Sequence, residues 1–127
     1  MPNSRSTAML TATCHCGAVR LEIPRKPRRL TSCNCSICHR YGTLWAYYKF
    51  RDVRVHAKRG AVMHYSWGDK DLKFVRCKTC GCITHWEPTR VRPDSRMGVN
   101  ARNLEPSAIA TVRVRHLDGA SSWKFLD

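Results

Sequence analysis

Long hydrophobic runs are missing from this sequence. No stretch approaches the roughly 18 apolar residues of a transmembrane helix, and the opening MPNSRSTAML lacks the apolar segment of a secretory leader. We therefore expect a cytoplasmic protein with no membrane association. Cysteine thiols stay reduced in that compartment, so disulfides are not expected.

Segments with the 3.6-residue hydrophobic period of a helix are missing too. Apolar and polar residues instead alternate over residues 18–23 and 111–117, as in half-buried strands. Five more segments between these two are rich in β-branched and aromatic residues: 44–50, 62–67, 72–77, 82–87 and 96–100. The pattern predicts a single all-β domain of about eight short strands over residues 9–127, after a disordered tail at residues 1–8.

Acidic residues are scarce. The chain has 9 Asp and Glu against 23 Lys and Arg, which gives a formal net charge of +14. Such a charge attracts acidic small molecules, nucleic acid or an anionic surface, and does not by itself distinguish among them. The densest basic run, PRKPRR at residues 24–29, has no aromatic residues interleaved for base stacking. Nucleic acid is therefore not the favoured partner.

Cysteine, by contrast, is abundant. Of the eight cysteines, two pairs stand in TCHCG and CKTCG, each followed by a glycine that permits the backbone angles of a tight turn. Four thiolates complete a tetrahedral zinc site, so we predict a structural zinc ion held by Cys14, Cys16, Cys77 and Cys80. Disulfides are the alternative, disfavoured because cysteines spaced C-x-C bridge only with strain.

A second group of cysteines lies in SCNCSICHR, which we interpret as a wide turn. Cys33, Cys35 and Cys38 supply three thiolates from one side, and a zinc ion held by three protein ligands keeps a fourth position for water or substrate. We predict a catalytic zinc site here. Two alternatives remain: closure of the site by Cys82 or a histidine, or a loop without metal. Cys82 shares a strand face with Cys80, which favours a buried apolar role for it.

An open three-cysteine zinc site suits a thiol substrate. A zinc ion lowers the pKa of a bound thiol, and the thiolate is the form that adds to aldehydes. A basic domain that carries such a site favours chemistry on an acidic thiol or on its adduct.

Four motifs in this order, TCHCGAVRLEI, CNCSICHRYG, FVRCKTCGC and GVNARNL, resemble the glutathione-dependent formaldehyde-activating enzyme family. The resemblance implies a β-tent fold with zinc-ribbon-like knuckles, a structural zinc on the first four cysteines and a catalytic zinc on the other three. It also implies a carbon–sulfur lyase-type activity, the formation of S-hydroxymethylglutathione from formaldehyde and glutathione. One branch of the family, centromere protein V, is associated with chromatin.

The resemblance also bears on residues near the second zinc. Members often have arginine directly after the third cysteine of the loop, whereas this chain has His39 and then Arg40. We consider Arg40 and Arg102 as groups that attract the carboxylates of a peptide thiol. His85 is a candidate proton shuttle or ligand, with a structural, hydrogen-bonded histidine as the favoured alternative.

Our interpretation is a two-zinc enzyme acting on glutathione or a related thiol adduct. The rival interpretation is a non-enzymatic basic zinc module that binds nucleic acid or an acidic partner, and the charge of +14 is its main support.

Overall fold

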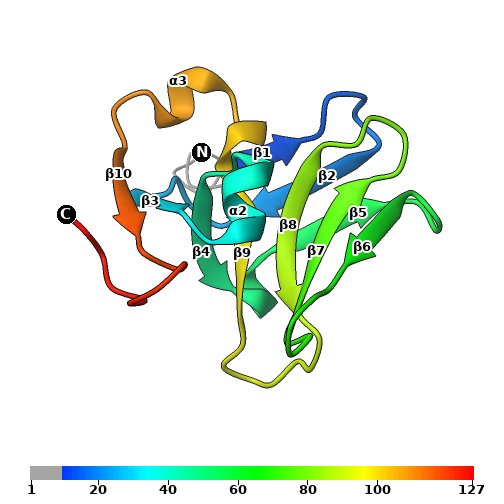
Figure 1. Ribbon diagram of the computed structural model, residues 1–127. Coiled ribbons are helices and arrows are strands. Elements are labelled where there is room, and N and C mark those ends of the chain that lie inside the picture. The colour runs from blue at the N-terminus through cyan, green and yellow to red at the C-terminus, as the bar shows by residue number, and fades with distance from the viewer. Residues whose placement is uncertain (1–9) are drawn as a thin grey trace.

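A computed structural model of the chain describes residues 10–127. Over this range the chain forms one domain of ten short strands in two sheets with little helix, which confirms the all-β prediction (Figure 1). The tail expected at residues 1–8 lies outside the described residues. The strands are β1 (Leu10–Thr13), β2 (Val19–Ile23), β3 (Arg29–Cys33), β4 (Trp45–Lys49), β5 (Arg54–Ala57), β6 (Val62–Tyr65), β7 (Leu72–Cys77), β8 (Ile83–Pro88), β9 (Arg96–Asn100) and β10 (Arg113–Leu117).

Strands β1, β3 and β5 were not expected from the sequence. Each has four or five residues and takes its place in a sheet by pairing with a neighbouring strand. Strand β3 begins at the last arginine of the PRKPRR run.

The helices are equally short: α2 (Ser36–Tyr41), α3 (Pro106–Ile109) and the 3-10 turns η1 (Phe50–Asp52) and η2 (Ala101–Asn103). Helix α2 replaces the wide turn expected in SCNCSICHR. Cys35 caps its N-terminus, where the Cys35 sulfur accepts a hydrogen bond from the Cys38 N–H, and Gly42 ends it in the left-handed conformation. No helix over residues 10–127 is both long and apolar enough to cross a bilayer.

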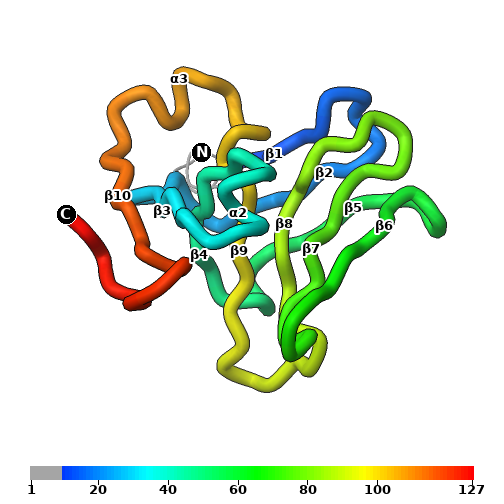
Figure 2. Tube along the Cα trace, in the orientation of Figure 1, coloured from blue at the N-terminus to red at the C-terminus, as the bar shows by residue number. Residues whose placement is uncertain are grey.

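The two sheets differ in size. The smaller has the order β1-β2-β5 and the larger the order β10-β3-β4-β9-β8-β7-β6. All pairs are antiparallel except β10 with β3, which are parallel. After β10, which is the edge strand of the large sheet, the chain reverses direction, and its last residues lie beside that strand (Figure 2). Leu117 and Phe125 form an antiparallel bridge there.

Buried side chains form two clusters. The larger contains aliphatic residues of β2, β4 and β9, together with Cys14 and Cys77. The smaller is largely aromatic and contains Cys33, Cys38, Trp45 and Phe74. Each of the two cysteine groups therefore has its own apolar support.

Candidate metal centres and cavity

Four sulfur atoms meet where two hairpin turns come together. The Sγ atoms of Cys14, Cys16, Cys77 and Cys80 all lie within 4.8 Å of one another, with Cys14 and Cys16 at 3.8 Å and Cys16 and Cys77 at 3.5 Å. Tetrahedral zinc–sulfur bonds of about 2.3 Å place sulfurs about 3.8 Å apart. This donor set fits a zinc ion, and all eight cysteines are free of disulfides.

The two turns belong to different sheets. Cys14 and Cys16 lie between β1 and β2 of the small sheet, whereas Cys77 ends β7 of the large sheet and Cys80 lies in the turn between β7 and β8. The glycines expected to shape these turns do have positive φ angles, +84° at Gly17 and +79° at Gly81. A metal ion here would therefore fasten the two sheets to each other.

Backbone N–H groups surround these sulfurs. The Val19 N–H donates to the Cys14 sulfur at 3.3 Å. The backbone N–H groups of Cys82 and Cys16 lower the pKa of Cys80 to about 5, and the backbone N–H of Cys80 lowers the pKa of Cys77. The Ala18 backbone N–H acts in the same direction on Cys16, but the side chain of Cys77, together with desolvation and the other cysteine side chains, outweighs it and raises the pKa of Cys16 to about 11. Such donors stabilise the thiolate form that binds metal.

The second group holds three sulfurs that also lie within 4.8 Å of one another, those of Cys33, Cys35 and Cys38. Cys33 ends β3, Cys35 caps α2 and Cys38 is inside that helix, so a single strand-to-helix turn brings the three together. The Cys38 N–H donates to the Cys35 sulfur at 3.5 Å, and the Trp45 indole Nε1–H donates to the Cys38 sulfur at 3.3 Å. The contact between the Cys33 and Cys38 side chains lowers the pKa of Cys33 to about 5 and raises the pKa of Cys38.

This group has no fourth ligand among the residues that the structure describes. Cys82 belongs to neither group: it packs against the larger core cluster and lines a separate cavity of about 580 Å³. The structure thus does not bring Cys82 to the three-cysteine group.

The three cysteines lie on a cavity of about 710 Å³, a size typical of sites for small organic ligands. Aromatic side chains dominate its wall, and the four tryptophans of the chain all take part. The lining residues are Cys33, Cys35, Ser36, Ile37, Cys38, Trp45, Tyr47, Trp67, Gly68, Asp69, Asp71, Leu72, Phe74, Trp86, Leu117, Gly119, Ala120 and Trp123.

One wall of the cavity comes from the turn after β10. Asn34, between two of the cysteines, donates to the Asp118 carboxylate at 3.1 Å and accepts from the Ala120 N–H at 2.9 Å. These bonds bring Gly119 and Trp123 to the cavity. We did not predict this wall from the sequence, since no local pattern links residues so far apart.

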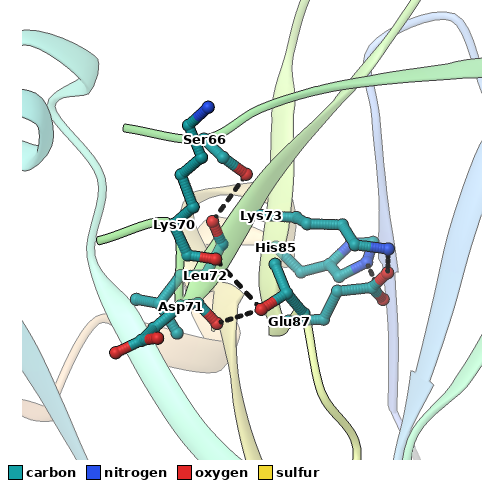
Figure 3. Close-up of polar contacts among 8 residues, drawn as sticks. Ser66, Lys70, Asp71, Leu72, Lys73, His85 and Glu87 are labelled. Atoms are coloured by element: carbon teal, nitrogen blue, oxygen red, sulfur yellow. Dashed lines mark hydrogen bonds and ion pairs between the residues drawn. The ribbon is translucent and has the colours of Figure 1, made fainter. Parts of the chain in front are cut away.

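Another wall comes from the loop between β6 and β7. The Ser66 hydroxyl donates to the Leu72 carbonyl at 2.8 Å (Figure 3). The Thr89 hydroxyl lies 3.0 Å from the Lys70 carbonyl and 3.1 Å from the Asp71 carbonyl, and donates to them. The loop so anchored places Trp67, Asp69 and Asp71 on the cavity.

The three candidate helper residues lie away from this cavity. His85 is 2 % exposed, and its Nδ1 contacts the Thr84 hydroxyl at 2.8 Å. Its Nε2 contacts Glu87 at 3.3 Å (Figure 3). Arg40 and Arg102 line the second cavity instead. There they donate to backbone carbonyls, Arg40 to Ser36 and Arg102 to Gly42.

Comparison with known proteins agrees with this geometry. The family model described as glutathione-dependent formaldehyde-activating enzyme matches residues 9–114. Among solved structures, a protein of Rhodobacter sphaeroides determined by structural genomics is 31 % identical, with a TM-score of 0.67. The match covers 83 % of this chain and 99 % of that one.

Proposed function

The chain belongs to the glutathione-dependent formaldehyde-activating enzyme family, and on that premise we propose that it is a zinc-dependent enzyme of the carbon–sulfur lyase type. It would join a thiol to a carbonyl carbon, or cleave the resulting adduct; S-hydroxymethylglutathione is the adduct that the family name suggests. The observation that carries this proposal is a group of three sulfurs on the wall of a cavity sized for a small ligand, with no fourth protein ligand among residues 10–127.

The two cysteine groups suit different roles. Cys14, Cys16, Cys77 and Cys80 would hold a structural zinc ion, because they complete a tetrahedral set between two sheets. Cys33, Cys35 and Cys38 would hold the catalytic ion. Bound there, a zinc ion supplies positive charge that favours the thiolate form of a substrate thiol.

The reaction itself needs no redox partner. A sulfur electron pair forms the carbon–sulfur bond, the carbonyl π pair moves to oxygen, that oxygen takes up a proton, and the thiol releases one to solvent. The reverse reaction breaks the same bond and returns thiol and aldehyde. The protein must therefore hold a thiolate, orient the carbonyl carbon toward it and limit competing water.

Residues on the cavity wall meet these needs. The Trp45 indole N–H and the Cys38 backbone N–H each donate to a cysteine sulfur, which fixes the positions of these sulfurs and stabilises their negative charge. The aromatic rings around them exclude water, and this strengthens electrostatic interactions inside the cavity.

The test is the absorption spectrum of cobalt-loaded protein before and after addition of a thiol. Cobalt–thiolate bands report the number of sulfurs on each ion, and the visible bands report its coordination geometry. We expect a cobalt ion at a four-sulfur site, whose visible bands do not change when a thiol is added. We expect a second cobalt ion at a three-sulfur site, whose visible bands change with glutathione or another thiol. A Cys35→Ala variant should keep the first site and lose both the change and the thiol-adduct activity.

Two results would overturn the proposal. One is a pair of saturated four-sulfur sites that no thiol affects, which would favour the basic binding module instead. The other is full thiol-adduct activity in a folded Cys35→Ala variant that retains only one metal ion.

A further inference from the structure

The charge of the cavity differs from that of the chain as a whole. The protein carries 23 Lys and Arg residues, yet no basic side chain lines the three-cysteine cavity over the described range 10–127. The only ionisable groups on the wall besides the cysteines and Tyr47 are the carboxyls of Asp69 and Asp71, both exposed. The arginines considered as carboxylate partners lie on the other cavity.

This distribution is unfavourable for an anionic thiol. Glutathione carries two carboxylates and one ammonium group. A carboxylate that enters the cavity loses water without gaining a cationic partner, and it meets two more carboxylates at Asp69 and Asp71. The volume of about 710 Å³ admits a tripeptide as well as a smaller molecule, so selection here rests on charge rather than size.

The wall offers instead a large aromatic surface. Trp45 is buried beside the cysteines, whereas the rings of Trp67 and Trp123 are 46 % and 68 % exposed. Exposed aromatic rings around an opening are typical of a ligand site. Tyr47 and Trp86 add a pair with ring centroids 6.2 Å apart.

A glycine in the neighbouring strand makes room for one of these aromatic rings. Trp86 stands opposite Gly98 in the β8–β9 ladder. Any side chain at Gly98 would overlap the Trp86 indole. The indole therefore lies against bare backbone, at a position where a β-branched residue would otherwise be favoured in a buried strand.

From these observations we infer that the thiol taken by this site has an apolar or aromatic body and carries no carboxylate. An amine on such a thiol would be tolerated, because Asp69 and Asp71 can pair with it. The inference rests on the proposed function, since it names the substrate class of the same site.

The test compares thiols that differ in one group. Benzyl mercaptan and 4-(mercaptomethyl)benzoate have the same aromatic body, and the carboxylate is far enough from the sulfur to change its acidity little. Binding to zinc-loaded protein is followed by tryptophan fluorescence, since the four tryptophans all line the cavity, and in parallel by the visible bands of cobalt-loaded protein. We expect benzyl mercaptan to bind roughly tenfold more tightly than its carboxylate analogue and than glutathione.

Variants locate the cause of this preference. The double variant Asp69→Asn, Asp71→Asn should bind the carboxylate analogue about threefold more tightly and leave benzyl mercaptan unchanged. Trp123→Ala should weaken benzyl mercaptan roughly tenfold. Asp94→Asn and Tyr65→Ala are the matched controls, because both residues are exposed and lie outside the cavity lining.

The outcomes separate this inference from the proposed function. If glutathione or the carboxylate analogue binds as tightly as benzyl mercaptan, the inferred substrate class is wrong and the proposed function stands. If no thiol changes the cobalt bands, the proposed function fails, and the inference fails with it.

Discussion

Gly119 lies directly against Cys33. A Cβ atom added at Gly119 would be 2.5 Å from the Cys33 sulfur and 3.3 Å from the Cys35 Cβ. The turn after β10 therefore completes the surroundings of the three-cysteine group, and Asn34 fastens it there through Asp118 and Ala120. The family model ends at residue 114, so this contact lies beyond the matched part of the chain.

We predict that Gly119→Ala weakens metal binding at the three-cysteine group. The added methyl group must displace the Cys33 sulfur, and disturbed ligand surroundings typically cost 10- to 100-fold in metal affinity, about 1–3 kcal/mol. Metal titration should show one site weakened and the four-cysteine site unchanged. Ser121→Ala, on the same turn and exposed, is the control. Two sites of unchanged affinity in Gly119→Ala would contradict the prediction.

The four-cysteine group should govern folding. Cys77 is fully buried in the larger core cluster and stands at the junction of the two sheets. Because a structural zinc ion contributes its binding free energy to folding, on the order of 10 kcal/mol, we expect Cys77→Ala to lose cooperative thermal unfolding. Circular dichroism melting curves measure this. Cys35→Ala is the comparison and should melt cooperatively; a normal curve for Cys77→Ala would exclude the structural role.

Trp45 should influence the metal through one hydrogen bond. Its indole N–H donates to the Cys38 sulfur at 3.3 Å, and its ring packs on Phe74 at a centroid distance of 6.2 Å. Trp45→Phe keeps an aromatic ring but removes the donor, so we expect metal affinity at the three-cysteine group to fall about tenfold. Because Trp45 is buried, the smaller ring should also cost about 1–2 kcal/mol of stability. Competition with a chromophoric chelator measures the affinity. An affinity equal to that of the wild type would show that the bond does not tune the site.

The position of Arg40 in the structure differs from the role expected from the sequence. The sequence favours a role in attracting substrate carboxylates, whereas the structure places Arg40 on the second cavity with its guanidinium bonded to the Ser36 carbonyl. We expect Arg40→Gln to leave the glutathione response of the cobalt spectrum within about twofold of the wild type. A loss of tenfold or more would return Arg40 to the substrate site.

The two cysteine groups could be predicted from sequence for different reasons. Cys33, Cys35 and Cys38 lie within one strand-to-helix turn, so spacing alone brings their sulfurs together. The pairing of the two hairpin turns followed from the need for four ligands. The all-β class likewise followed from the residue types of seven segments, all of which became strands.

The cavity could not be predicted in this way. Trp67 and Trp123 reach the cysteines from segments distant in sequence, and only tertiary packing decides which turn faces which. The same holds for Arg102, whose neighbour at Gly42 is 60 residues away. Short strands such as β5 gain their pairing from a neighbouring strand rather than from their own pattern.

Glu87 should add a dependence of stability on pH. The hydrogen bond with buried His85 is the main cause that lowers the pKa of Glu87 below its ordinary value of 4.5, against the opposing effect of burial; Lys73, 4.0 Å from the carboxylate, adds to the lowering. A carboxyl group whose pKa is lower in the folded state contributes stability above pH 4.5, and this contribution is lost as the pH falls through the lowered pKa. We therefore expect the wild type to be about 1 kcal/mol more stable than Glu87→Gln near pH 6, with the difference shrinking below pH 4.5.

Urea unfolding of both proteins at each pH measures this difference. Acid also protonates the cysteine ligands, but that effect is common to the two proteins and cancels in the comparison. Glu105→Gln is the matched control, because Glu105 is exposed and its side chain makes no capping hydrogen bond; this variant should follow the wild type at every pH. A difference for Glu87→Gln that stays constant from pH 6 to pH 4 would mean that the hydrogen bond with His85 does not depend on the charge of Glu87.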